Sequence, residues 1–269
     1  MRISAFQFTP SFGDVPENLR CITARLAGVE ADLVVLPELC TTGYQLTSGE
    51  LERLAEPFPG GATSDALLAL ADREDTYLVA GVAERDGDRF YNSAVLVGPG
   101  GHVATYRKTH LFAAEKDLFE PGDTGFSVHE VRGCKVGMMV CFDWIFPESM
   151  RCLALLGADV VAHCANLVLP WCQRSMPLRC LENGLFAITA NRCGTEARTS
   201  ETLRFTGASQ VVSPRGEVLA HAPEAEDHLL TLRIDPAEAR DKWLTTNNHL
   251  LQDRRPALYT ALASKGGPK

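Results

Sequence analysis

The chain has 269 residues, enough for one large α/β domain or two small ones, and 45% of them are hydrophobic, enough for a sizeable core. Its net charge of −8 and scattered basic residues argue against binding to nucleic acid or to an anionic membrane. No apolar run reaches the roughly 20 residues that cross a bilayer. The nine cysteines lack the paired spacing of a metal site, which predicts free thiols in a reduced, cytoplasmic protein.

Strand and helix signals alternate along the chain without a linker. Apolar runs predict strands over residues 2–8, 32–36, 77–84, 91–98, 103–107, 136–140, 159–164, 185–191, 208–212, 217–222 and 228–234. Helical periodicity predicts helices over 14–29, 64–74, 148–156 and 173–183. The tail over 241–258 is polar and irregular, and from about residue 242 we expect it to pack on the domain or on a partner subunit.

This order of elements predicts a single domain spanning residues 1–269. We expect two mixed sheets packed face to face with helices on both outer faces, an α-β-β-α sandwich. A doubly wound α/β sheet is the competing topology.

Cys141 stands at the turn between the strand over 136–140 and the helix over 148–156. A thiol in such a turn is held rigidly, and the positive end of the following helix would favour the nucleophilic thiolate. Taken alone, an unpaired cysteine is more often a buried spacer, as we expect for cysteines 152, 164, 172, 180 and 193. His163, inside an apolar strand, is more simply a satisfied core histidine than a ligand.

Glu38 and Lys108 could complete a catalytic set with Cys141. Nucleophilic catalysis by cysteine needs a base for the thiol proton and an electropositive group for the developing oxyanion. The spacings of 70 and 33 residues fit three strands that deliver these side chains to a common sheet edge. Taken alone, Glu38 could be a solvated loop acid and Lys108 a surface lysine.

Three segments resemble the signatures of the nitrilase superfamily of carbon–nitrogen hydrolases, namely Leu36–Tyr44 (LPELCTTGY), Tyr106–Phe112 (YRKTHLF) and Cys141–Glu148 (CFDWIFPE). Shorter likenesses occur at Tyr91–Ala94, Glu115–Gly122 and Arg179–Asn183, and the whole similarity runs from Arg2 to about Ile234. The resemblance implies the α-β-β-α sandwich and a Glu-Lys-Cys triad supported by a second glutamate. It implies no cofactor and no metal.

Carried over residue by residue, the resemblance gives each of these groups a role. Glu38 would be the general base, Lys108 the cation that stabilises the oxyanion, and Cys141 the nucleophile. Glu115 matches the second glutamate, and the backbone N–H of Phe142 would complete the oxyanion hole. The implied chemistry is two-step acyl transfer through a cysteine thioester.

Substrate preference is less constrained by the sequence. Family nitrilases usually have Trp-Glu or Gly-Glu after the cysteine, whereas this chain has Phe142-Asp143, which favours an amide over a nitrile. The predicted pocket wall comprises Tyr44, Trp144, Asn166 and Trp171. We therefore expect a small primary amide as substrate.

Three alternatives stay open: a nitrilase, an N-carbamoyl amino acid or amine hydrolase, and a catalytically silent binding member of the family. A carbamoyl hydrolase would need a basic side chain for a substrate carboxylate, and Arg174 and Arg179 are the candidates. For Arg179, a structural ion pair with Glu182 on one helix, beside Asn183, is the simpler interpretation. The resemblance also implies a homodimer or higher homo-oligomer, joined through the helices over 148–156 and 173–183.

Overall fold

The computed structural model describes residues 1–264 and has two six-stranded sheets at its centre. The first sheet has the order β14-β1-β2-β3-β4-β5, formed by β1 (Arg2–Gln7), β2 (Leu33–Val35), β3 (Tyr77–Asp86), β4 (Arg89–Gly98), β5 (Gly101–Arg107) and β14 (His228–Arg233). The second has the order β13-β12-β9-β8-β7-β6, formed by β6 (Val128–Val131), β7 (Cys134–Val140), β8 (Val160–Ala165), β9 (Phe186–Asn191), β12 (Gln210–Val212) and β13 (Val218–His221).

Each sheet combines a parallel centre with antiparallel flanks, so both are mixed, as predicted. β1, β2 and β3 run parallel in one sheet, and β7, β8 and β9 run parallel in the other. The sheets pack face to face, with β1 against β9, β3 against β8 and β4 against β7.

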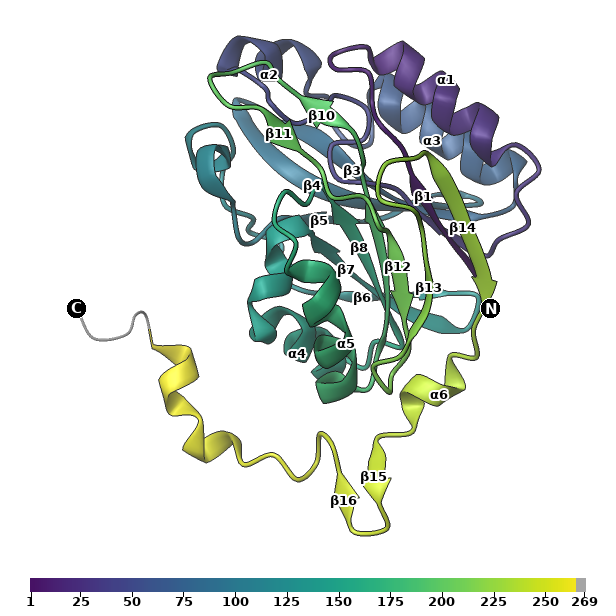
Figure 1. Ribbon diagram of the computed structural model, residues 1–269, viewed down its shortest axis with the longest axis vertical. Coiled ribbons are helices and arrows are strands. Elements are labelled where there is room, and N and C mark those ends of the chain that lie inside the picture. Colours follow the sequence, from purple (N-terminus) through teal and green to yellow (C-terminus); the bar gives the residue numbers. More distant parts are fainter. Residues whose placement is uncertain (265–269) are drawn as a thin grey trace.

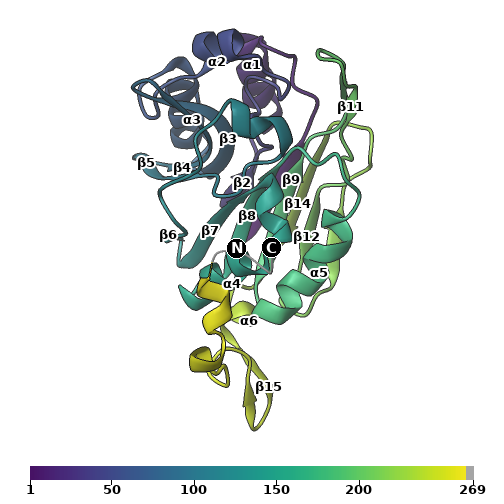
Figure 2. The ribbon, with the colours of Figure 1, turned by 90° about the vertical axis from the view of Figure 1, so that its left-hand side faces the viewer.

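Helices cover both outer faces, which confirms the α-β-β-α sandwich and excludes the doubly wound alternative. The pair α1 (Val15–Leu26) and α3 (Ala62–Arg73) lies on the first sheet, whereas α4 (Pro147–Leu155) and α5 (Cys172–Asn183) lie on the second (Figures 1 and 2). None of the helices within residues 1–264 is long and apolar enough to cross a membrane.

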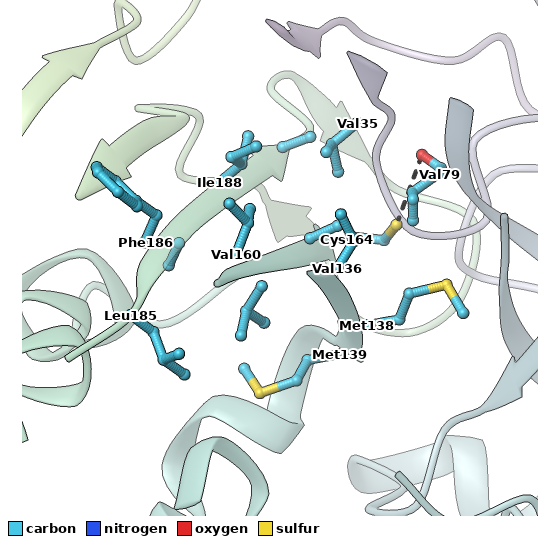
Figure 3. Close-up of a cluster of buried hydrophobic side chains, with 14 of the residues drawn as sticks. Val35, Val79, Val136, Met138, Met139, Val160, Cys164, Leu185, Phe186 and Ile188 are labelled. Atoms are coloured by element: carbon cyan, nitrogen blue, oxygen red, sulfur yellow. Dashed lines mark hydrogen bonds between the residues drawn. The ribbon is translucent and has the colours of Figure 1, made fainter. Parts of the chain in front are cut away.

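Apolar side chains fill the space between the sheets (Figure 3). Val35 and Val79 from the first sheet meet Val136 and Met138 from the second. The Cys164 thiol lies 3.9 Å from the Val79 carbonyl oxygen, so this cysteine is a small spacer between the sheets. Burial of such side chains, each worth about 1.5–3 kcal/mol, fixes the spacing of the layers.

The predicted helices and strands are present, but several turns and short elements were missed. The turn predicted between β7 and α4 is present, and it takes the form of a 3₁₀ turn, η2 (Cys141–Ile145). The unpredicted elements before the tail are β6, α2 (Ser48–Leu54), η1 (Ala113–Asp117), β10 (Thr195–Glu196), β11 (Leu203–Arg204) and α6 (Ala237–Arg240). α1 ends at Leu26, three residues before the predicted position, because Ala27 turns extended and Gly28 takes a positive φ.

The tail is more ordered than predicted. It contains a hairpin of β15 (Trp243–Thr245) and β16 (Asn248–His249), followed by the 3₁₀ turns η3 (Pro256–Leu258) and η4 (Thr260–Ala263). Its start is anchored because Lys242 Nζ donates to the carbonyl oxygens of Asn183 (3.1 Å) and Gly184 (2.6 Å). Beyond this point the tail leads away from both sheets (Figure 1).

Candidate active site

The carboxylate of Glu38 lies in the interior, three residues after β2 ends. Its Oε1 accepts hydrogen bonds from Lys108 Nζ and Asn92 Nδ2, each at 2.7 Å. Its Oε2 is equally buried but has no hydrogen-bond partner. Burial raises the pKa of Glu38, Lys108 opposes this rise, and Glu115 adds to it. One oxygen is therefore fixed in place, and the other is free to take a proton.

Gly81 on β3 allows the Glu38 segment to cross over this strand. The Gly81 N–H donates to the Pro37 carbonyl at 3.1 Å, and the Cys40 N–H donates to the Gly81 carbonyl at 2.9 Å. A Cβ at position 81 would stand 2.4 Å from the Glu38 Cα and 2.8 Å from the Leu39 nitrogen. Only glycine leaves room for the backbone that presents the carboxylate.

We expect Gly81→Ala to destabilise the protein by about 1–3 kcal/mol or more and to lower kcat/KM, because the added methyl displaces Glu38. Denaturant unfolding and steady-state kinetics measure the two effects. Gly49→Ala is the matched control, since a Cβ at this α2 position meets nothing within 4 Å. Equal stability and activity in both variants would contradict the role of the close approach.

Lys108 directly follows β5, and its ammonium group is fully buried between two carboxylates. Its Nζ donates to Glu38 Oε1 at 2.7 Å and to Glu115 Oε1 and Oε2 at 2.8 and 2.7 Å. Glu115, on η1, also accepts the Tyr44 hydroxyl (2.7 Å) and the Phe112 N–H (3.1 Å). Burial alone would lower the pKa of Lys108, but Glu115 and Glu38 outweigh it and raise that pKa. The lysine is thus a fixed cation.

The backbone on both sides of Lys108 is also held. The Lys108 N–H donates to the Asn92 carbonyl at 2.8 Å, and the Gly122 N–H donates to the Lys108 carbonyl at 2.9 Å. Gly122 must be glycine, because a Cβ there would stand 2.0 Å from the Arg107 carbonyl oxygen. Asn92 and Gly122 occur in the segments that resembled the family, but their contacts were not foreseen.

Cys141 is the first residue of η2 and adopts a left-handed backbone with φ +41°. Its side chain opens onto a small pocket of about 20 Å³, lined by Phe112, Phe142, Trp144, Asn166, Leu167, Val168 and Leu169. Burial and then the charge of Glu38 raise the pKa of the Cys141 thiol well above its ordinary value, although Lys108 lowers it. α4 begins at Pro147, within one residue of the predicted start, but burial shifts the thiol pKa in the direction opposite to that expected from a nearby helix N-terminus.

The site lies between the two sheets rather than at the edge of one, which corrects the sequence-based picture. Glu38 and Lys108 follow strands of the first sheet, whereas Cys141 follows β7 of the second. The charges of Glu38, Lys108 and Glu115 all act on the thiol, so the four groups form one cluster.

Asp143, two residues after the nucleophile candidate, is completely buried and joins both sides of the site. Its carboxylate accepts the Tyr106 hydroxyl (2.8 Å) and the Val140 N–H (3.0 Å). It also accepts the His110 backbone N–H (3.2 Å) and contacts His110 Nδ1 at 2.7 Å. These contacts tie the segment around Lys108 to the turn that holds Cys141.

The predicted substrate-binding residues divide into two groups. Trp144 and Asn166 line the pocket beside Cys141. Tyr44 is instead bound to Glu115, and Trp171 lies outside the pocket lining with 49% of its surface exposed.

The two candidate arginines have other partners. Arg179 forms the structural ion pair with Glu182 that the sequence suggested, at 3.1 Å. It also donates to the carbonyl oxygens of Trp144 and Ile145. Arg174 is exposed and donates to the Pro170 carbonyl.

In a comparison with known proteins, the family model for carbon–nitrogen hydrolases matches residues 2–242. The chain belongs to the carbon–nitrogen hydrolase family. This carbon–nitrogen hydrolase is 49% identical over 230 residues to a nitrilase of Pyrococcus abyssi, covering 85% of this chain and 86% of the relative. It is 37% identical over 262 residues to an (R)-stereoselective amidase of a Pseudomonas species, covering 95% and 92%.

Its fold matches that of the amidase from Nesterenkonia sp. AN1, with a TM-score of 0.80 and 28% identity over 97% of this chain and 99% of that one. In a variant of that amidase, acrylamide has undergone Michael addition at the active-site cysteine. The carbon–nitrogen hydrolase described here is therefore an amidase-type enzyme of the nitrilase superfamily.

Proposed function

We propose that the protein hydrolyses a small primary amide to a carboxylic acid and ammonia through a thioester on Cys141. The observation that carries the proposal is the buried cluster of Glu38, Lys108 and Glu115, whose charges act on the Cys141 thiol. It supplies a proton acceptor, a fixed cation and a nucleophile without further groups.

The first half-reaction transfers the acyl group to sulfur. Cys141 Sγ attacks the amide carbon while Glu38 Oε2 takes the thiol proton, and the carbonyl electron pair moves to oxygen. Lys108 Nζ and the Phe142 N–H stabilise the resulting oxyanion, for which the lysine releases one of its carboxylate contacts. Protonated Glu38 then gives its proton to the departing nitrogen, the C–N bond breaks, and ammonia leaves a thioester behind.

The second half-reaction restores the enzyme. Glu38 takes a proton from water as the hydroxyl attacks the thioester carbon. The same two donors stabilise the second oxyanion, and its collapse releases the acid. The sulfur leaves as thiolate and recovers its proton from Glu38. Glu115 keeps Lys108 in place throughout.

Asn166 favours an amide over a nitrile. Both Nδ2 and Oδ1 of this buried side chain lack a hydrogen-bond partner, although the residue lines the pocket beside Cys141. The unpaired N–H₂ and C=O of Asn166 complement a primary amide, which has one carbonyl acceptor and two N–H donors. A nitrile has only an acceptor. Nitrile hydrolysis is the second candidate function, because the Pyrococcus relative is named a nitrilase.

The pocket at Cys141 admits little more than one small group, because a single water already needs about 10–15 Å³. A wider groove of about 830 Å³ shares Val168 with this pocket and is lined further by Pro170, Gln173, Arg204 and Phe205. We propose that the carboxamide enters the pocket while the rest of the substrate lies along this groove.

A panel of propionamide, propionitrile and N-carbamoylglycine tests the function. We expect ammonia from propionamide at the highest kcat/KM, together with an acyl adduct on Cys141 by mass spectrometry of the quenched reaction. Fastest release from the nitrile would establish a nitrilase, and carbon dioxide released with ammonia would establish a carbamoyl hydrolase. No turnover across a broad panel of amides, with Cys141 free of adduct, would indicate a silent binding protein.

The pH dependence follows from the state of Glu38. Since this glutamate must be ionised to accept the thiol proton, and its pKa is raised above the ordinary 4.5, kcat/KM should fall as the pH drops through that raised value. Alkylation of Cys141 by iodoacetamide should follow the same acidic limb. A rate that instead rises only near the ordinary thiol pKa of 9.0 would show that the thiol ionises without Glu38.

We further propose a cytoplasmic homodimer of one domain each, since all nine cysteines are free and apolar side chains are exposed on the second helical layer. These are Leu155 and Leu156 at the end of α4, and Leu178 and Leu181 on α5. The tail from about residue 242 would cover part of the partner subunit. Light scattering should give twice 29.3 kDa, and a monomeric mass would contradict the dimer.

A further inference from the structure

His163 contacts the carbonyl oxygen of the nucleophile candidate. The ring is completely buried on β8, where His163 lies opposite Met139 of β7 and Thr189 of β9. Its Nε2 lies 2.9 Å from the Cys141 carbonyl oxygen, and its Nδ1 lies 3.1 Å from Thr189 Oγ1. It is a satisfied core histidine, as the sequence indicated, but one partner belongs to the active-site turn.

The chemistry of these partners fixes the tautomer. A carbonyl oxygen only accepts, so Nε2 must carry the hydrogen and donate it to Cys141, and Nδ1 must accept the Thr189 hydroxyl. Burial lowers the pKa of His163 to about 4, so the ring is neutral at neutral pH. The single N–H of the neutral ring therefore donates to the Cys141 carbonyl oxygen.

The Cys141 carbonyl shares a rigid peptide group with the Phe142 N–H, the proposed oxyanion donor. The peptide bond between these residues is trans, so its C=O and N–H point in opposite directions. Any force that fixes the carbonyl therefore also fixes the N–H. Such a force is needed here, because Cys141 has a φ of +41°, which a residue with a side chain rarely adopts.

We propose that His163 is a positioning residue for the oxyanion hole: by holding the Cys141 carbonyl, it aims and polarises the Phe142 N–H toward the reacting oxygen. A hydrogen bond to the C=O of a peptide strengthens its N–H as a donor, because hydrogen bonds in a chain polarise one another. This inference rests on the proposed cysteine mechanism and adds a residue that never touches the substrate.

Two probes of Cys141 separate this role from a general structural one. Propionaldehyde adds to the thiol as a thiohemiacetal whose oxygen occupies the oxyanion hole. Iodoacetamide alkylates the same thiol by displacing iodide, a step that forms no oxyanion. In the full-length protein, His163→Leu should weaken propionaldehyde inhibition and lower kcat, each by roughly 10- to 100-fold, which is the size of loss expected when one oxyanion donor is weakened. The rate of Cys141 alkylation by iodoacetamide should stay within about threefold of the wild-type rate.

His163→Gln should recover most of the loss, since a glutamine Nε2 can donate to the same carbonyl. Thr189→Val, which keeps the ring but removes its orienting partner, should weaken propionaldehyde binding by roughly three- to tenfold. This variant also carries the test if His163→Leu fails to fold. The proposal is overturned if His163→Leu, or Thr189→Val in its place, leaves propionaldehyde inhibition unchanged, or if alkylation and inhibition fall together.

Failure of the proposed function itself has a different signature. In that case the wild-type protein would release no ammonia from any member of the substrate panel and would not be bound by propionaldehyde, and no His163 variant would be needed to show it. A wild type that reacts with both probes, paired with insensitive His163 variants, would reject only the present inference.

Discussion

The Cys141→Ala variant should fold normally and lose amide hydrolysis by about 10⁴-fold or more, because no other group can form the thioester. Alanine is compatible with the backbone of η2 and removes only the sulfur from a buried position in the core. Circular dichroism and the melting temperature report the fold, and ammonia release reports the activity.

Cys152→Ala is the matched control, since this thiol is exposed on α4, outside the pocket. The control should keep full activity and still form the acyl adduct. Persistent turnover in Cys141→Ala, or its loss in Cys152→Ala, would refute the assignment of the nucleophile.

Lys108→Met should have the largest effect on stability. It leaves the carboxylates of Glu38 and Glu115 buried without their cation, which costs about 3–5 kcal/mol for a broken buried pair. The variant should also be inactive, because the oxyanion loses its charged donor. Denaturant unfolding and kinetics measure these two losses.

The stability loss should grow with pH. Without the lysine, burial still raises the pKa of Glu38, and the neighbour that lowered it is gone. The stabilising contribution of protonated Glu38 is then complete at low pH and disappears as the pH rises through its raised folded pKa. Adding Glu115→Gln should restore part of the stability but no activity. Lys116→Met, an exposed neighbour on η1, should change neither, and a pH-independent loss in Lys108→Met would contradict the buried-charge explanation.

The local sequence patterns predicted where the reactive groups stand along the chain. The apolar run before Cys141 marks β7, and the periodicities of α1 and α3 give the layer that covers the first sheet. The strand order in each sheet was not predicted, but the two mixed sheets with helices on both outer faces were. These features depend on residues close in sequence, and this is why patterns of polarity report them.

The contacts of the site depend on distant segments, and local patterns could not give them. Glu38 reaches Lys108 only because its segment crosses β3 at Gly81, 43 residues later. A turn was predicted after β7, but its 3₁₀ form was not, because the turn is fixed in part by Asp143, which accepts the N–H of Val140. Trp171 was expected in the pocket because it is apolar, but α5 begins beside it and leaves it half exposed.

Asp143 has a practical consequence for redesigning this catalyst. The residue two positions after the cysteine differs from that of family nitrilases, which makes it a tempting target for converting substrate preference. Because its four contacts brace Tyr106, Val140 and His110, an exchange for glutamate would force an extra methylene into a fully enclosed space. Mutant libraries that aim to change substrate preference should leave this aspartate unchanged and randomise Phe112 and Trp144, which line the pocket beside Cys141.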